Sequence, residues 1–199
     1  MNHYRLYKNL NVQPFLEEIN LNDDWRKAVG RGIYMRQGER YDRIDLIKGF
    51  RNPGDPESKP LSELCIDVNT PTVHSTYTGV IPTKVFPKYK IVSAFLNWFK
   101  ETYNAKIARV RYIKIPSGCS IGLHIDGGPY FQKTHRFHLV LQGKYQYTVH
   151  EETLEYKEGE LWWFDNKKLH KLYNHGNEDR IAMIFDCKCD MERIINDLE

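Results

Sequence analysis

The chain has 199 residues, which suits one domain with a sizeable hydrophobic core and is short for two domains of ordinary size. Hydrophobic residues make up 41% of the sequence and aromatic residues 13%, a composition that excludes an intrinsically disordered protein. The formal net charge of +3 is too small to indicate a polyanionic partner by itself.

The sequence carries no signal for membrane insertion or secretion. No apolar stretch reaches the roughly 20 residues that a membrane-spanning helix needs, and the first ten residues are too polar for a signal peptide. The four cysteines follow neither a zinc-binding spacing nor the pattern of a disulfide scaffold. We therefore expect a cytoplasmic protein in a reducing compartment, without a membrane partner.

The N-terminal part of the chain is basic and rich in turn residues. Residues 25–51 carry eight Lys or Arg against three Asp or Glu, with aromatic residues between them. Such a run is most often a solvated surface, and the alternative is a docking surface for a nucleic acid or an acidic peptide. Residues 52–60 (NPGDPESKP) have the composition of an exposed loop.

One long helix is predicted over residues 86–103. Its apolar residues, from Ile91 to Phe99, recur at intervals of three and four, and Pro87 is compatible with a first helical turn. We therefore expect residues 1–104 to form a helical and loop region that flanks the core of a single domain spanning residues 1–199.

From residue 105 onward the hydrophobic pattern changes to a period of two. Short runs rich in β-branched and aromatic residues alternate with clusters of Gly, Asn and Asp. Many short strands at such spacing are typical of an antiparallel barrel or a double-sheet jelly roll, and we place this core at residues 105–189. A short closing helix is expected at 191–198. The expected strands are 107–115, 119–123, 135–142, 145–150, 161–165 and 180–187.

His124 and Asp126 lie at the end of an expected strand, directly before the turn Gly127-Gly128-Pro129. An imidazole and a carboxylate at this spacing can converge on one cation, as two of the three ligands in the 2-His-1-carboxylate triad of non-haem Fe(II) enzymes. The simpler alternative is an exposed histidine and an aspartate that shapes a glycine turn.

His170 and Arg180 are expected on the two arms of a hairpin, with a turn at residues 174–177 between them. Arg180 begins an otherwise apolar strand, and by alternation it shares a face with Ala182 and Ile184. If that face lines the interior, the buried guanidinium needs a carboxylate, which a small molecule could supply. The alternative is an exposed arginine paired with Glu178 or Asp179.

Two polar residues stand two apart on the expected strand 135–142. Arg136 and His138 share a face with Val140, opposite Phe137 and Leu139. This face lines either a polar cavity or the solvent.

Taken together and in this order, the motifs resemble those of a known family. They are HxD at 124–126, RFHL at 136–139, EGELWWFDN at 158–166, His170, and Arg180 ten residues later. The sequence is similar here to the aspartyl/asparaginyl β-hydroxylases, Fe(II)- and 2-oxoglutarate-dependent oxygenases whose family includes hydroxylases of free amino acids such as the proline cis-hydroxylases. The likeness covers residues 109–186. We expect a mainly β fold with flanking helices around a double-stranded β-helix core, the jelly roll of cupin-like proteins.

The resemblance implies that His124, Asp126 and His170 bind the iron. Family members that act on aspartyl or asparaginyl residues of proteins have glycine where the carboxylate would be, whereas the amino-acid hydroxylases keep an HxD motif. Because Asp126 is present, we assign it as the third metal ligand.

The resemblance also implies that Arg180 binds the far carboxylate of 2-oxoglutarate, and that Arg136 and His138 touch the cosubstrate or the substrate. The implied enzyme uses Fe(II), 2-oxoglutarate and O2 to hydroxylate an amino acid, free or within a peptide or protein. One alternative is the same chemistry on a nucleic acid docked at residues 25–51. Another is a cupin-like protein that binds a metal or small ligand without turnover, which would not need a buried guanidinium.

Overall fold

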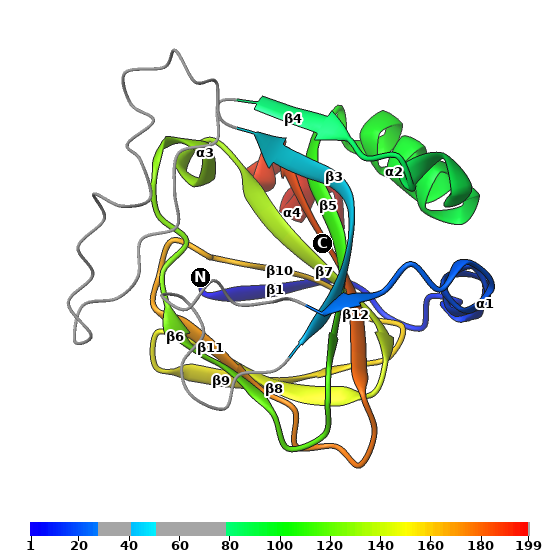
Figure 1. Ribbon diagram of the computed structural model, residues 1–199. Helices are drawn as coiled ribbons and strands as arrows, with labels where there is room; N and C mark the ends of the chain where they lie inside the picture. Colours follow the sequence, from blue (N-terminus) through cyan, green and yellow to red (C-terminus); the bar gives the residue numbers. More distant parts are fainter. Residues whose placement is uncertain (28–40, 51–78, 199) are drawn as a thin grey trace, which may run out of the picture.

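A computed structural model describes residues 1–27, 41–50 and 79–198 (Figure 1). Most of the basic segment 25–51, namely residues 28–40 and 51, lies outside the described residues, and so does the expected loop 52–60. In the part that is described, no helix is both long and apolar enough to cross a bilayer.

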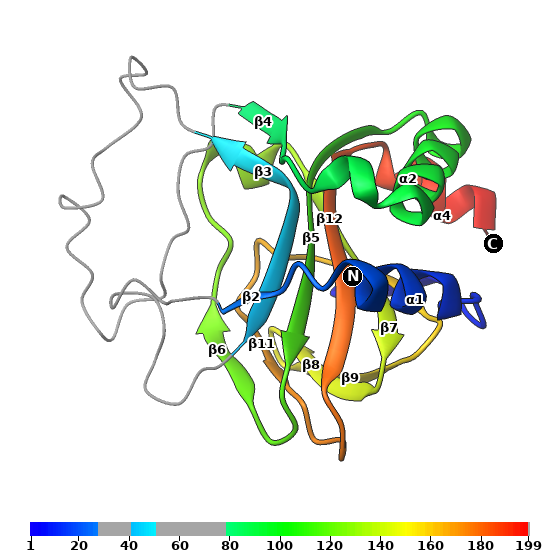
Figure 2. The ribbon, with the colours of Figure 1, turned by 45° about the vertical axis from the view of Figure 1, so that its right-hand side comes forward.

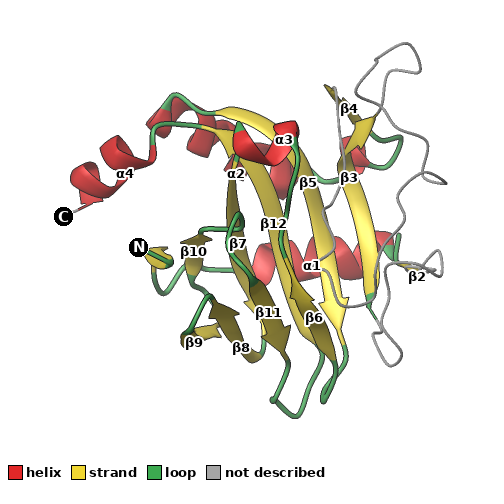
Figure 3. Ribbon diagram, turned by 90° about the vertical axis from the view of Figure 1, so that its left-hand side faces the viewer, coloured by secondary structure: helices red, strands yellow, loops and turns green. Residues whose placement is uncertain are grey.

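The described strands form two antiparallel sheets that lie against each other (Figures 1 and 3). The large sheet has the order β1-β10-β7-β12-β5-β3-β2, with β4 paired to β3, and the small sheet has the order β6-β11-β8-β9. The large sheet contains β1 (His3–Tyr7), β2 (Arg26–Lys27), β3 (Asp42–Phe50), β4 (Gly79–Pro82), β5 (Lys106–Ile115), β7 (His135–Gln142), β10 (Leu161–Phe164) and β12 (Arg180–Lys188). The small sheet contains β6 (Ser120–His124), β8 (Lys144–Val149), β9 (Glu152–Lys157) and β11 (His170–Tyr173).

The eight strands from β5 to β12 are those of a jelly roll. Strands β5, β12, β7 and β10 neighbour one another in the large sheet, and β6, β11, β8 and β9 do so in the small one. This order is that of two interleaved Greek keys. The predicted mainly β fold with a double-stranded β-helix core is confirmed.

The described part of the N-terminal region contributes four strands to this sheet and also contains two α-helices. β1 pairs with β10 at one edge of the core, and β3 pairs with β5 at the other. The sequence analysis expected only helices and loops here. Strands β1 and β3 were not predicted, because their partners lie far along the chain. Packing against a partner strand, rather than the local sequence pattern, stabilises a strand.

Three helices cover the outer face of the large sheet (Figure 2): α1 (Gln13–Asn22), α2 (Lys90–Tyr103) and α4 (Met191–Leu198). Helix α2 buries the residues on one face, and its Phe99 ring lies 5.1 Å from Phe137 and 5.0 Å from Phe185 between centroids. Burying each such ring contributes about 1.5–3 kcal/mol. The outer core therefore anchors β7 and β12, two strands that each carry two buried charged or polar residues.

The long helix predicted over 86–103 is wrong at its start. A 3-10 turn, η2 (Phe86–Lys88), comes first, and Tyr89 follows with φ −94° and ψ 80°, so α2 begins only at Lys90. Tyr89 is fully buried and its hydroxyl donates to Asp24 at 3.3 Å. This tertiary contact, which the local sequence does not reveal, favours the break. The short helix predicted at 191–198 is present as α4.

The second core fills the space between the two sheets. Its apolar part includes Val140 and Ile184 from the large sheet and Tyr147 from the small one. The alternation predicted for β12 holds, since Met183 and Phe185 belong to the outer core. The inner faces of β7 and β12 therefore bring polar residues, described next, into the interior.

Candidate metal centre

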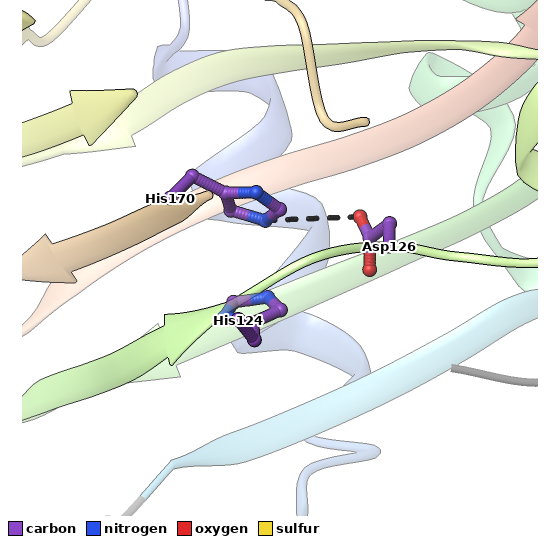
Figure 4. A group of neighbouring side chains, drawn as sticks. All are labelled: His124, Asp126 and His170. Atoms are coloured by element: carbon purple, nitrogen blue, oxygen red, sulfur yellow. Dashed lines mark ion pairs between the residues drawn. The ribbon is translucent and has the colours of Figure 1, made fainter. Parts of the chain in front are cut away.

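Two histidines and an aspartate meet at one end of the small sheet. His124 ends β6, His170 begins β11, and the two are directly paired across the antiparallel strands. Asp126 follows β6 by two residues. One ligand atom from each of the three side chains lies within 4.8 Å of the others, and His170 Nε2 is 3.8 Å from Asp126 Oδ2 (Figure 4). The described ranges hold no second group of this kind.

The chain turns sharply after Asp126. Gly128 has a φ of 98°, a backbone conformation that favours glycine, and the helical turn α3 (Pro129–Gln132) starts directly after it. Proline suits the first helical position because it needs no hydrogen-bond acceptor there. The predicted glycine turn is thus present, but Asp126 itself is 5% exposed, so it does more than shape a surface turn.

Both imidazoles present Nε2 to the centre. His124 Nδ1 lies 2.7 Å from the carbonyl oxygen of Gly122, and His170 Nδ1 lies 2.8 Å from that of Lys168. Because a carbonyl only accepts, each Nδ1 donates a proton, and in the neutral form of either ring Nε2 holds the lone pair. Burial and then the neighbouring His124 lower the pKa of His170 to about 3, so its imidazole is neutral at physiological pH. His170 Nε2 is buried and has no hydrogen-bond partner in the part of the chain that the structure describes.

Asp126 is held as a carboxylate. It accepts hydrogen bonds at Oδ2 from Arg136 Nη1 and, at 3.2 Å, from Asn166 Nδ2. Burial alone would raise the pKa of Asp126, but the charge of Arg136 outweighs it and keeps the pKa below its usual range. Two imidazoles and one carboxylate are the donor set of the facial triad of non-haem iron sites, so the residues fit a divalent transition metal.

A buried guanidinium lies deeper between the sheets. Arg180, the first residue of β12, is fully buried. Its Nη2 donates to Tyr145 Oη at 2.9 Å and approaches His138 Nδ1 at 3.3 Å, whereas Nε and Nη1 are buried without a partner among the described residues. Neither Glu178 nor Asp179 pairs with it, and no carboxylate of the described residues lies within ion-pair distance. The interior placement considered for this strand face is therefore the one observed.

His138 connects the guanidinium to the metal centre. Because arginine has only donors, His138 Nδ1 accepts from Arg180. Burial and then the charge of Arg180 lower the pKa of His138 well below its ordinary value, so the ring is neutral. The rings of Tyr147 and Phe164 contact both His138 and His170, with centroid distances of 5.0–6.0 Å. Arg180, His138 and the triad thus surround one interior region.

Arg136 lies between two carboxylates of the protein. It lies on the inner face of β7, as alternation predicted, but its Nε and Nη2 donate to Asp186 at 2.8 and 3.2 Å while Nη1 reaches Asp126. Three of its donors therefore serve carboxylates of the protein. A role toward cosubstrate or substrate stays a prediction.

Four residues near the site were not singled out from the sequence. Asp186 continues the inner face of β12 two residues beyond Ile184, so extending the alternation by one step would have found it. Asn166 lies inside the motif at 158–166 that carried the resemblance. Arg109 and Tyr145 gave no signal, because only their partners across the fold give them a polar interior role.

The jelly roll and its group of two histidines and one aspartate place this chain among β proteins with a candidate metal site. The family model of the aspartyl/asparaginyl β-hydroxylases matches residues 82–189, more than half of the chain. The chain therefore belongs to the aspartyl/asparaginyl β-hydroxylase family, and the resemblance found in its motifs is confirmed.

Solved structures share the fold at low sequence identity. An oxidoreductase of the 2OG-Fe(II) oxygenase family from Burkholderia pseudomallei has a TM-score of 0.57 and 9% identity, over 94% of this chain and 85% of that one. A predicted oxalate decarboxylase from Thermotoga maritima (TM-score 0.36, 21% identity, 48% and 72% coverage) and the cupin domain of Cnp3 from Schizosaccharomyces pombe (0.36, 15%, 48% and 73%) overlap less. No curated protein sequence matches the chain.

Proposed function

We propose that this protein is an Fe(II)- and 2-oxoglutarate-dependent hydroxylase of an amino acid, free or within a peptide or protein. Membership of the hydroxylase family supports the reaction class. The observation that carries the proposal is Arg180, a fully buried guanidinium with two unpartnered nitrogens in the interior that it shares with the His124–Asp126–His170 centre.

A buried guanidinium without an anion is costly, because an isolated charge loses its hydration and gains nothing in return. A carboxylate resolves this cost, and the planar fork of arginine binds it through two hydrogen bonds. Nε and Nη1 of Arg180, which have no hydrogen-bond partner among the described residues, can each donate to such a carboxylate, while Nη2 remains on Tyr145. A dicarboxylate such as 2-oxoglutarate would place one end here and the other at the metal.

The protein's own residues prepare this interior for both ligands. Backbone carbonyls orient the two imidazoles, and Arg136 keeps Asp126 ionised. The buried rings of Tyr147 and Phe164 exclude water from the region between His138 and His170. When bound, ferrous iron would couple the oxidative decarboxylation of 2-oxoglutarate by O2 to hydroxylation of a C–H bond.

Succinate release tests the proposal. The purified protein, supplied with Fe(II), 2-oxoglutarate and O2, is screened against free amino acids and short peptides that contain aspartate, asparagine or proline. We expect succinate to form with at least one substrate, and Arg180→Met to abolish it. The control Arg193→Met changes an exposed arginine of α4 and should retain the activity. If the wild-type protein neither binds 2-oxoglutarate nor forms succinate, the proposal is wrong.

A further inference from the structure

Four charged side chains form a continuous buried network beside the metal centre. Asp186 accepts from Arg136 Nε and Nη2, from Arg109 Nε at 3.1 Å, and from the hydroxyl of Tyr130 at 3.2 Å. Arg136 then reaches Asp126 through Nη1. Each of the four charged residues is at most 8% exposed. Two arginines and two aspartates balance one another, as burial requires.

This network crosses from one sheet to the other. Asp186 lies on β12 and Arg136 on β7, two paired strands of the large sheet, in which these residues are direct partners. Asp126 follows β6 of the small sheet. The ion pair between Arg136 and Asp126 therefore joins the metal centre to a strand that contributes none of the three candidate ligands.

Asp186 controls how Arg136 can approach Asp126. Arginine and a carboxylate frequently form a two-pronged pair with two parallel hydrogen bonds. Here Asp186 binds the edge of the guanidinium that Nε and Nη2 form, and the nitrogen that contacts Asp126 is Nη1, at Oδ2. Asn166 Nδ2 contacts the same oxygen. Both side-chain contacts thus fall on one oxygen of the carboxylate.

We propose that Asp186 is a positioning residue for metal binding: its pair with Nε and Nη2 holds the Arg136 guanidinium so that Nη1 contacts Asp126 only at Oδ2, which leaves that carboxylate able to bind the metal. This inference rests on the proposed function, because it treats Asp126 as a metal ligand. It assigns Arg136 to the protein's own carboxylates rather than to the cosubstrate. Partners that orient metal ligands typically contribute 10- to 100-fold to metal affinity.

Titration calorimetry of the metal-free full-length protein with Mn(II) alone tests the proposal. We expect Asp186→Asn, which keeps the shape but loses the charge, to weaken Mn(II) binding by roughly 10- to 100-fold. Asp186→Glu, which keeps the charge, should recover part of this loss. The control is Glu160→Gln, another buried carboxylate with an arginine partner, Arg5, but outside the network. It should bind Mn(II) as the wild type does.

Two further measurements distinguish a positioning role of Asp186 from a general contribution to stability. Thermal unfolding of the metal-free variants shows whether Asp186→Asn and Glu160→Gln lose comparable stability, and Tyr130→Phe, which removes one hydrogen bond to Asp186, provides a milder variant that should weaken Mn(II) binding less. Binding of 2-oxoglutarate is measured at saturating Mn(II), where Asp186→Asn should stay within about twofold of the wild type.

The outcomes distinguish the two proposals. If the wild-type protein binds Mn(II) and folded Asp186→Asn binds it equally well, Asp186 has no positioning role and only this inference fails. If Asp186→Asn loses 2-oxoglutarate affinity at saturating Mn(II) but keeps its Mn(II) affinity, Arg136 serves the cosubstrate and the inference is again wrong. If the wild type binds no divalent metal, the proposed function fails first and the inference fails with it.

Discussion

The guanidinium of Arg180 lies over the ring of Tyr145, with 4.2 Å between Cζ and the ring centroid, and also donates to the hydroxyl of that residue. The two residues come from opposite sheets, β12 and β8. Tyr145 therefore fixes the orientation of a guanidinium whose Nε and Nη1 meet no acceptor in the described ranges. The predictions below begin with this pair.

Tyr145→Phe keeps the ring and removes the hydroxyl that holds Arg180. A hydrogen bond to a charged group contributes about 1.5–3 kcal/mol, and part of this loss should reach the ligand through a less ordered guanidinium. We expect 2-oxoglutarate binding to the Mn(II)-loaded protein to weaken by roughly 5- to 30-fold. The matched control is Tyr156→Phe, whose buried hydroxyl contacts His3 instead. Equal binding by the two variants would contradict the prediction.

Arg180→Lys tests the geometry of the fork rather than its charge. An ammonium group is a point charge on a flexible stem and cannot reproduce two parallel hydrogen bonds to a carboxylate. We expect the KM for 2-oxoglutarate to rise by at least about tenfold, while the Mn(II) affinity of the protein changes little. Succinate formation at increasing 2-oxoglutarate concentrations measures the effect. An unchanged KM would mean that Arg180 does not bind the cosubstrate.

Asp126→Asn tests the third metal ligand through stability. A metal that binds only the folded protein stabilises it by about 2.7 kcal/mol when present at 100 times its Kd. We expect Mn(II) to raise the Tm of the wild type by several degrees and to leave that of Asp126→Asn nearly unchanged. The neighbouring carboxylate variant Asp165→Asn, outside the triad, should respond as the wild type does. A full Mn(II) response in Asp126→Asn would exclude the carboxylate as a ligand.

The stability of the metal-free protein should fall as the pH is lowered below about 6.5. Burial, and then Arg180, lower the pKa of His138 in the folded state, so that the unfolded state binds its proton first. Stability from this group is present above pH 6.5 and decreases by up to about 1.4 kcal/mol per pH unit below it.

His138→Asn isolates this contribution, because an amide oxygen can still accept from Arg180 but does not titrate. Urea unfolding between pH 6.5 and 4.5 gives the free energy of unfolding as a function of pH. Its slope against pH should be smaller in the variant by the equivalent of one proton, about 1.4 kcal/mol per pH unit. The same slope in both proteins would show that His138 is not held neutral in the folded state.

The sequence contained the main features of the interior, because they follow from local alternation. The periodicity of β12 and β7 brought Arg180, Arg136 and His138 to the inner faces, where the structure places them. The local pattern could not predict which residues these side chains contact. That Arg136 joins Asp126 to Asp186 depends on the pairing of β7 with β12 and on the approach of the small sheet.

The same limit explains the errors at the N-terminal side. Strand β1 exists because it pairs with β10, more than half the chain away, and Tyr89 leaves the helical conformation because its side chain is buried against Tyr112 and Asp24. The sequence around Tyr89 and β1 does not reveal either contact. Periodicity predicts which face of an element is buried, but not what it is buried against.

The two histidines and Arg180 lie on different sheets, and this placement has a consequence for local unfolding. Both imidazoles belong to the small sheet and the free guanidinium nitrogens to the large one, so a diacid held by the metal at one end and by Arg180 at the other would act as a crosslink between the layers. Cosubstrate binding would then slow the local opening of both sheets together, and amide protection in β11 and β12 would rise in concert.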